Sequence, residues 1–313
     1  PTCAFKDMAL QILPHFMRTA VQKTTPGEQI VILVATSGDT GKAALEGFRD
    51  VPGTKILVFY PSEGVSEMQR LQMVTQEGAN VGVCALRGNF DDAQTGVKAL
   101  FTDPDMIGAL ERHGMRFSSA NSINWGRLLP QIVYYFSVYC DMVRSGAVAL
   151  GQPINVVVPT GNFGNILAAY YAGRMGVPLH KLVCASNANR VLTDFFETGV
   201  YDCNRPFYTT TSPSMDILVS SNLERLLYHL SGEDCGALRE WMTGLKTERR
   251  YAVPAAVREQ LDARFAAGSA TDAQVAETIR RVFEEKHYLC DTHTAVAVRV
   301  YEEYRARTGD TVP

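Results

Sequence analysis

Residues 30–41 read Ile-Val-Ile-Leu-Val-Ala-Thr-Ser-Gly-Asp-Thr-Gly. An uninterrupted run of β-branched and apolar residues is typical of a strand buried on both faces, and the two glycines after it allow a tight turn into a helix. Similar strand-and-helix pairs follow along the chain. We expect strands at residues 30–35, 55–60, 80–86, 116–120, 154–159 and 181–186, and helices at residues 42–48, 66–75, 91–101, 125–145 and 166–175. This alternation predicts an α/β fold in which helices cover parallel sheets.

The long helix expected at residues 125–145 separates the strands into two groups, which indicates two parallel-sheet domains. We expect residues 26–124 to form a small α/β domain and residues 125–313 a large domain with helical additions. Residues 1–25 would add a helix at the interface of the two. After residue 186 the strand pattern fades, and residues 233–270, rich in charge and in helix formers, are expected on the surface.

Composition excludes several classes of protein. A net charge of −3 and a pI near 6.1 argue against a nucleic-acid-binding surface, which needs a basic excess. No apolar run is long enough to span a membrane, and no signal peptide opens the sequence. The seven cysteines form no CxxC pair, so we expect a reducing, cytoplasmic compartment, no metal site, and buried thiols at Cys84 and Cys184. Since no initiator methionine is present and the chain closes directly after a last helix at residues 293–307, we expect a chain truncated at both ends.

A lysine stands at the start of the first predicted helix. Apolar residues recur there at helical spacing: Ile12, Leu13, Phe16, Met17 and Ala20. Lys6 therefore falls in the first turn, where the helix dipole disfavours a cation. That favours the uncharged amine and suits a nucleophilic or Schiff-base lysine. Taken alone, such a lysine is more often a solvated surface residue.

Residues 36–41 form a junction between a predicted strand and a predicted helix. Its glycines allow close approach of an anion, and its hydroxyl groups and free helix N–H groups can bind one. The alternative is a plain helix cap, in which Asp39 or Thr40 caps a helix that begins at Lys42. The junction resembles the end of a P-loop, but Thr36 and Ala43 stand where that motif needs a glycine and a hydroxyl residue. An NTPase is excluded.

Residues 161–165, Gly-Asn-Phe-Gly-Asn, form a second junction of this kind after the strand at 154–159. Consecutive backbone N–H groups there can cradle a phosphate. The spacing is not that of a dinucleotide-binding fingerprint. The alternative is an ordinary turn in which Asn162 adopts a left-handed conformation. Two such junctions at the carboxyl ends of parallel strands, with an N-terminal lysine, predict a phosphorylated aldehyde cofactor and an anionic substrate in one crevice.

Six blocks in order resemble the signatures of threonine synthase, a pyridoxal-phosphate enzyme of fold type II (the tryptophan-synthase-β type), in its bacterial and fungal branch. They are Pro-Thr-Cys-Ala-Phe-Lys-Asp at 1–7, the junctions at 36–41 and 161–165, Asn-Ser-Ile-Asn-Trp at 121–125, Ser-Pro-Ser-Met-Asp-Ile at 212–217 and Asp-Thr-His-Thr-Ala at 291–295. The chain departs from the family at Cys3, Arg190 and Thr292, and lacks the usual regions before the first block and after the last.

The resemblance implies a role for each block. Lys6 would bind pyridoxal 5'-phosphate as a Schiff base and then transfer protons. Thr294 would face the pyridine nitrogen, and the cofactor phosphate would be held by Gly161, Asn162, Phe163, Gly164 and Asn165. The α-carboxylate of the substrate would be bound by Thr36, Ser37, Gly38, Asp39 and Thr40. Asn124 and Arg127 would bind the substrate phosphate, although for Arg127 a solvated position on the long helix is an equal alternative.

The implied reaction converts O-phospho-L-homoserine and water into L-threonine and phosphate, which is the work of a carbon–oxygen lyase in amino-acid biosynthesis. A threonine-synthase-like phospholyase or a serine/threonine dehydratase would keep the same cofactor blocks. A non-enzymatic binding protein is a third alternative, against which the retained Lys6 argues. The expected partner is the small-molecule substrate, with no nucleic acid and no membrane, and the sequence leaves open whether the protein is a monomer or a dimer.

Overall fold

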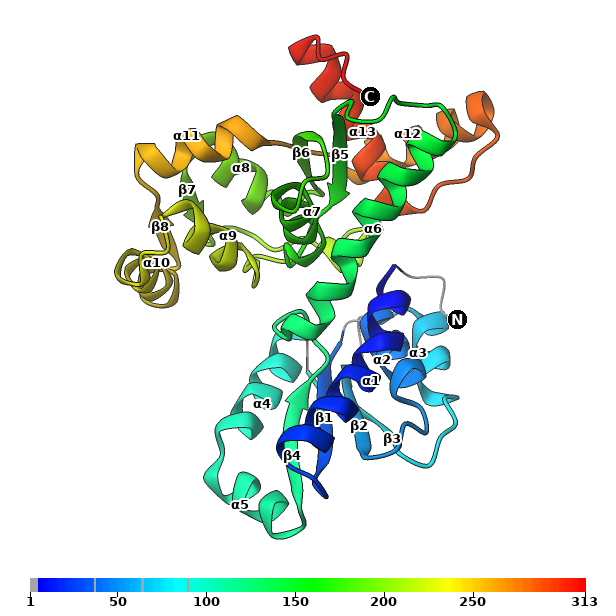
Figure 1. Cartoon of the computed structure of the whole chain (residues 1–313), viewed down its shortest axis with the longest axis vertical. Helices are drawn as coiled ribbons and strands as arrows, with labels where there is room; N and C mark the ends of the chain where they lie inside the picture. The colour runs from blue at the N-terminus through cyan, green and yellow to red at the C-terminus, as the bar shows by residue number, and fades with distance from the viewer. Residues whose placement is uncertain (1–4, 37, 63–64, 89) are drawn as a thin grey trace. The chain divides into compact units, whose positions relative to one another are not determined.

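The computed structural model describes residues 5–36, 38–62, 65–88 and 90–313. The chain divides into two compact units, Pro1–Gln131 and Ile132–Pro313. Each unit holds a parallel sheet with helices packed on it (Figure 1), so the expected α/β class is confirmed. The finer domain limits expected from the sequence stay a prediction. No described helix is both long and apolar enough to cross a membrane.

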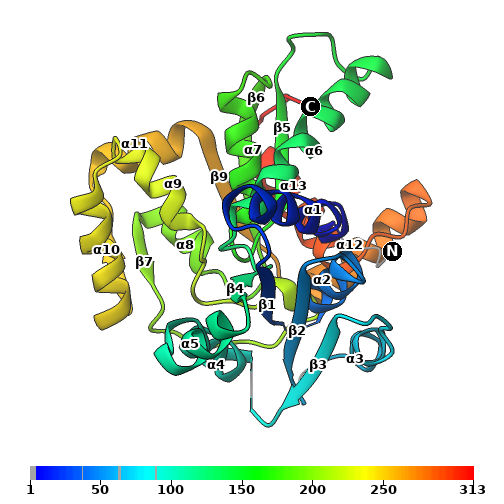
Figure 2. The ribbon, with the colours of Figure 1, turned by 60° about the horizontal axis from the view of Figure 1, so that its bottom comes forward.

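The first unit is built on a four-stranded parallel sheet in the order β3-β2-β1-β4. Figures 1 and 2 both show β1 (Gln29–Ala35) between β4 (Met115–Ser119) and β2 (Thr54–Pro61), with β3 (Val81–Leu86) at the edge. After its first residue β1 is apolar and buried throughout, because it has a neighbouring strand on each side and helices on each face.

Two hydrophobic clusters join the helices of this unit to the sheet. One includes residues of α1 (Lys6–Thr24), α2 (Asp39–Phe48) and α3 (Glu67–Val74). The other includes residues of α4 (Phe90–Thr102) and α5 (Pro104–Arg112). Side chains of β1 enter the two clusters alternately, as the period of a strand requires: Ile30, Ile32 and Val34 in the first, and Val31, Leu33 and Ala35 in the second.

The second unit holds a three-stranded parallel sheet in the order β5-β6-β9. Its strands are β5 (Ile154–Pro159), β6 (Leu179–Ser186) and β9 (Phe265–Ser269). Two helices, α12 (Asp272–Lys286) and α13 (Thr292–Thr308), pack on this sheet through a cluster that includes Val183, Ala185, Val275, Val296 and Val300.

Smaller elements complete the chain. The helix α6 (Trp125–Arg144) contains the residues at which the first unit ends and the second begins. The remaining helices are α7 (Gly164–Arg174), α8 (Val191–Thr198), α9 (Leu223–Leu230), α10 (Cys235–Thr247), α11 (Ala255–Arg264) and the 3-10 helix Pro213–Met215. A short antiparallel pair joins β7 (Val200–Asp202) to β8 (Arg250–Ala252).

The structure corrects several expectations. The six expected strands are present, but the sequence does not predict α5, β7, β8 or β9. The surface position expected for residues 233–270 holds for most of residues 233–264, although Trp241 and Leu261 are buried, and it is wrong for β9, which is a strand of the main sheet. β9 reads Phe-Ala-Ala-Gly-Ser and has no β-branched residue, so it lacks the usual strand signal. Cys184 is buried as expected, whereas Cys84 is exposed because β3 is an edge strand.

Candidate active site

Lys6 is the first residue of α1, and only 9% of it is exposed. The helix α1 packs closely against α2, backbone to backbone. A Cβ on Gly47 of α2 would lie 2.0 Å from the carbonyl oxygen of Leu10, so only glycine allows this approach. The packing brings Lys6 to the first turn of α2, where its amine forms an ion pair with Asp39.

The surroundings of Lys6 lower the pKa of its amine. Burial lowers the pKa of the Lys6 amine, the carboxylate of Asp39 partly offsets this, and the positive charge of Arg127 adds to the lowering. Arg127 is itself only 5% exposed and donates from Nη1 to the carbonyl oxygen of Ala120 at 2.8 Å. The solvated alternative for Arg127 is therefore wrong, while its predicted role in binding phosphate stays a prediction.

The junction after β1 is organised by Thr36. Its hydroxyl oxygen accepts hydrogen bonds from the backbone N–H groups of Gly38 at 3.0 Å and Gly41 at 2.9 Å. The helix begins at Asp39 with Gly38 at the N-cap, so the expected cap by Asp39 or Thr40 before a helix starting at Lys42 is wrong. Ser37 lies outside the described residues.

The carboxylate of Asp39 is held at both oxygens. Oδ1 accepts a hydrogen bond from the N–H of Thr40 at 2.8 Å, and Oδ2 contacts Nζ of Lys6. A substrate carboxylate would be repelled by this negative side chain. If residues 36–40 bind the substrate carboxylate, they do so through their hydroxyl and backbone groups and not through Asp39. This binding stays a prediction.

Residues 121–124 form the turn between β4 and α6, and Trp125 begins the helix. Asn121 donates from Nδ2 to the carbonyl oxygen of Ala35 at 3.1 Å, which ties the turn to the end of β1. Asn124 donates from Nδ2 to the carbonyl oxygen of Ser119 at 2.8 Å and accepts at Oδ1 from the N–H of Gly126 at 2.9 Å. The structure thus groups the predicted residues of the first unit at the carboxyl ends of the neighbouring parallel strands β1 and β4.

In the second unit, residues 161–165 follow β5 and begin α7. The left-handed residue is Phe163, with φ of 63°, and not Asn162, as the alternative of an ordinary turn required. Its ring is buried against Phe196 and Phe265, at centroid distances of 6.2 Å from each, which holds the backbone in this conformation. A Cβ on Gly161 would lie 2.7 Å from the carbonyl oxygen of Ser214, so only glycine fits there.

Neutral side chains that the sequence does not predict hold this loop. Ser220 donates from Oγ to the carbonyl oxygen of Gly161 at 2.7 Å, and Asn222 donates from Nδ2 to that of Asn162 at 2.8 Å. The hydroxyl of Tyr135 donates to Oδ1 of Asn165 at 2.8 Å, and burial raises the pKa of Tyr135, so the phenol stays protonated. The only signal for the first two is a polar run, Ser-Ser-Asn at 220–222, directly before an apolar helix.

Thr294 lies in the first turn of α13, next to the N-cap residue Asp291. Its hydroxyl donates to Oδ2 of Asp291 at 2.5 Å. Burial alone would raise the pKa of Asp291, but hydrogen bonds from the hydroxyl and N–H of Thr294 and from the N–H of His293 lower it, so the cap stays ionised. His293 accepts at Nε2 from the N–H of Ser214 at 3.2 Å, which joins this helix start to the segment beside Gly161.

Each unit, taken by itself, holds groups whose chemistry suits one part of a phosphorylated aldehyde. A left-handed residue before a helix start turns backbone N–H groups towards one point, and the helix dipole favours an anion there. Phe163 stands at the N-cap of α7 and has no side-chain oxygen or nitrogen to bind those N–H groups. In the first unit, a buried lysine with a lowered pKa is the group that condenses with an aldehyde.

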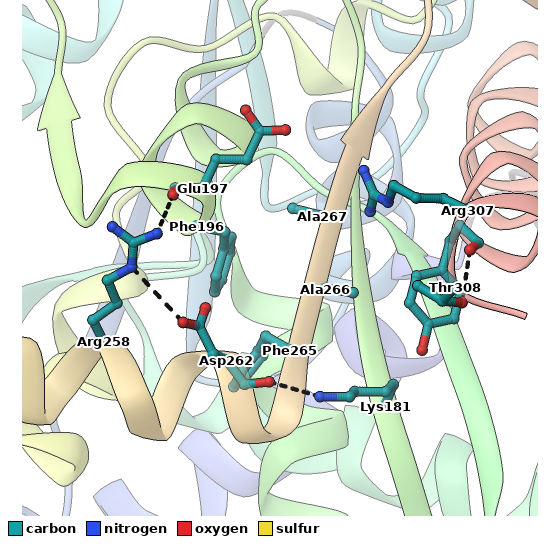
Figure 3. Close-up of a pocket in the computed structure, with 11 residues that line it drawn as sticks. Lys181, Phe196, Glu197, Arg258, Asp262, Phe265, Ala266, Ala267, Arg307 and Thr308 are labelled. Carbon is teal, nitrogen blue, oxygen red and sulfur yellow. Dashed lines mark hydrogen bonds and ion pairs between the residues drawn. The ribbon is translucent and has the colours of Figure 1, made fainter. Parts of the chain in front are cut away.

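A separate pocket of about 360 Å³ lies in the second unit and contains none of the predicted site residues (Figure 3). Lys181, near the start of β6, donates from Nζ to the carbonyl oxygens of Asp262 at 2.6 Å and Ala263 at 3.0 Å. Arg258 donates to that of Thr198 at 2.9 Å. Both cations thus bind carbonyl oxygens at the carboxyl ends of helices, α11 and α8. The pocket lies at the amino ends of β6 and β9, away from the loop at residues 161–165, which follows β5.

Comparisons with known proteins agree with this arrangement. Residues 1–311 match the family described as "Pyridoxal-phosphate dependent enzyme". The chain is 42% identical to "Threonine synthase-like 1" of Homo sapiens over 98% of this chain and 42% of that protein. It is also 42% identical to threonine synthase of Pseudomonas aeruginosa, over 97% of this chain and 62% of that protein.

Among solved structures, the pyridoxal-phosphate-bound threonine synthase of Brucella melitensis matches with a TM-score of 0.89 and 40% identity, over 100% of this chain and 64% of that chain. The chain thus spans about two fifths of the length of the threonine synthase-like relative and less than two thirds of the length of the threonine synthases. The chain belongs to the pyridoxal-phosphate-dependent enzymes of fold type II, a family whose cofactor is pyridoxal phosphate, and its relatives there include threonine synthases and threonine synthase-like 1.

Proposed function

We propose that this chain carries the chemistry of a threonine synthase, which converts O-phospho-L-homoserine and water into L-threonine and phosphate. One observation supports this most strongly. A chain 42% identical to a threonine synthase over 97% of its length keeps a buried lysine with a lowered pKa and a loop into which only glycine fits at position 161. The substrate is a small molecule, and we expect the reaction in the cytoplasm.

In this proposal the second unit holds the cofactor. Residues 161–165 would bind its phosphate through backbone N–H groups at the start of α7, and the hydroxyl group of Thr294 would lie on the side of the pyridine nitrogen. When bound, pyridoxal phosphate withdraws electron density from the carbon atoms of the substrate, which allows protons to leave them. A hydroxyl group, unlike a carboxylate, does not enforce protonation of the pyridine nitrogen.

Lys6 moves the protons. Its amine would hold the cofactor covalently before substrate arrives and would afterwards be free to act as a base. It removes a proton from Cα of the substrate and another from Cβ, and the phosphate group leaves with its bridging oxygen as the C–O bond at Cγ breaks. Lys6 then returns one proton to Cγ. Water adds its hydroxyl group at Cβ and gives its proton to the departing phosphate, and Lys6 returns the second proton to Cα. A lowered pKa suits this work because a larger share of the amine is uncharged.

The first unit also supplies the proposed substrate contacts. Arg127 and Asn124 bind the substrate phosphate, for which a guanidinium group offers paired N–H donors. The hydroxyl and backbone groups of residues 36–40 bind the α-carboxylate. These contacts hold the reacting carbons while water is delivered to Cβ and not elsewhere.

A second candidate is a phospholyase, which releases phosphate and ammonia and leaves 2-oxobutyrate. The relatives named threonine synthase-like 1 favour this candidate, because they are as similar to the chain, at 42% identity, as the threonine synthase of Pseudomonas aeruginosa is. Such an enzyme would keep every proposed cofactor contact. It would differ in the fate of the carbon skeleton.

Incubation with O-phospho-L-homoserine, followed by chromatography of the amino and keto acids, tests both candidates. The synthase gives threonine and phosphate in equal amounts, whereas the phospholyase gives 2-oxobutyrate in place of threonine. Borohydride reduction followed by peptide mapping should attach the cofactor to Lys6, with exposed Lys23 on the same helix as the unlabelled control. Attachment at another lysine would overturn the assignment of Lys6.

A further inference from the structure

Lys6 and Asp39 form an ion pair that the proposed chemistry of Lys6 does not require. The two residues are 33 positions apart, and each is the first residue of its helix. Their exposure differs: the Lys6 side chain is 10% exposed and that of Asp39 is 24% exposed. Asp39 therefore lies between a nearly buried amine and the solvent.

The orientation of Asp39 is fixed from the other side. The N–H of Thr40 donates to Oδ1 at 2.8 Å, which leaves Oδ2 to contact Nζ of Lys6. Both bonds are made to a carboxylate at a helix start, where a negative charge is favoured. The carboxylate thus has a preferred position from which it can hold the lysine or take a proton from it.

Among the described residues, two charged groups act on Lys6: Asp39 from α2 and Arg127 from α6. The neighbouring Asp7 is buried on α1. Farther along α2, Lys42 and Glu46 pair with each other at 3.5 Å. The carboxylate of Asp39 opposes both burial and Arg127, so it is the group that keeps a proton on Lys6.

We propose that Asp39 is a positioning residue that holds Lys6 as an ammonium ion in the cofactor-free protein and accepts its proton when the amine must become nucleophilic. The transfer is balanced: Nζ loses one proton, Oδ2 gains it, and both groups become neutral. Asp39 then passes the proton to water through its exposed edge. This inference rests on the proposed role of Lys6 as the cofactor lysine.

The test measures the reactivity of Lys6 in the cofactor-free protein with acetic anhydride at a series of pH values, followed by peptide mapping. Since only the uncharged amine reacts, the profile reports the proton held by Lys6. Asp39→Asn removes the opposing charge, so the midpoint should move to lower pH. A shift of one pH unit raises labelling at fixed pH by about tenfold. The rate of cofactor loading should show the same shift in its pH profile.

Two further variants make the result specific. Glu46→Gln removes a carboxylate from the same helix that does not act on Lys6, so it should leave the profile unchanged. Asp39→Glu keeps the charge and should restore a profile close to wild type, which guards against a folding defect in Asp39→Asn. An unchanged profile in Asp39→Asn, or an equal shift in Glu46→Gln, would overturn the proposal. Borohydride attachment at a different lysine would overturn the proposed role of Lys6 while leaving the acylation result interpretable.

Discussion

At the start of α1, charged side chains meet: Lys6 pairs with Asp39, and the positive charge of Arg127 lowers the pKa of Lys6. At the start of α7, neutral groups hold a backbone loop: Ser220 and Asn222 bind its carbonyl oxygens, and the carbonyl oxygen of Ser214 lies where a side chain on residue 161 would be. The first region depends on charge and the second on shape.

The difference fits the roles that we propose for the two regions. A group that gains and loses protons needs a pKa that its neighbours can change, and charged neighbours do this most strongly. A group that holds a phosphate through many steps needs fixed donors, and a loop held by neutral hydrogen bonds keeps its geometry at every pH. Variants should therefore fail in different ways in the two regions.

The largest effect should come from Lys6→Ala. Loss of a positioned base costs roughly 10²- to 10⁴-fold in turnover. The variant should still bind pyridoxal phosphate without a covalent bond, because the loop at residues 161–165 is unchanged. Threonine formation and equilibrium dialysis measure the two properties, with Lys23→Ala as the control on the same helix. Turnover near wild type in Lys6→Ala would contradict the assignment.

Gly161→Ala should damage the other region. Its Cβ would lie 2.7 Å from the carbonyl oxygen of Ser214, and backbone cannot move aside as a flexible side chain can. Overpacking of this kind costs roughly 1–3 kcal/mol, or about tenfold to a hundredfold in cofactor affinity. The pH profile of Lys6 acylation should not change.

Gly96→Ala is the control for this substitution. No described atom lies within 4 Å of a Cβ at Gly96 in α4, so alanine should leave cofactor binding unchanged and stabilise the helix by about 0.5–1 kcal/mol. Equal loss of cofactor affinity in the two variants would show that shape at residue 161 is not the cause.

Arg127→Ala should have an intermediate effect on catalysis. Loss of one charge-assisted hydrogen bond to the substrate costs about 1.5–3 kcal/mol, or roughly tenfold to a hundredfold in kcat/KM. The share of 2-oxobutyrate over threonine should also rise, since the substrate is held less firmly while water adds. Arg144→Ala, on the exposed end of α6, is the control. An unchanged product ratio would remove Arg127 from the substrate site.

Much of the fold is predictable because its strands are apolar and its helices amphipathic. The run at residues 30–35 carries its own signal, and so does the strand at 154–159. β9 is not predictable from its sequence, because Ala and Gly have low strand propensity and only pairing with β6 makes this segment a strand.

The candidate site residues can likewise be divided into those that the sequence predicts and those that it does not. Glycines and a lysine stand next to predicted helix starts, so the sequence alone predicts the loop at residues 161–165 and Lys6 as site residues. The pairing of Lys6 with Asp39 depends on how closely α1 packs on α2 at Gly47, and no spacing in the sequence encodes that contact. Ser220 and Asn222 act over a separation of about 60 residues, for the same reason.

The smallest effect concerns stability in the cofactor-free protein. Burial lowers the pKa of Lys6 from its ordinary 10.5, with Asp39 opposing and Arg127 adding to the shift. Between the lowered pKa and 10.5 the unfolded chain binds more protons than the folded one, so the free energy of unfolding rises with pH across that window. Lys6→Met lacks this titration, while every other lysine titrates alike in both proteins. Urea unfolding at several pH values should therefore show wild type gaining stability over Lys6→Met as the solution becomes alkaline.

Gly161→Ala should instead differ from wild type by the same free energy of unfolding at each pH, because the structure around residue 161 depends on packing and not on charge. Parallel curves for wild type and Lys6→Met would mean that the folded chain does not change the affinity of Lys6 for its proton.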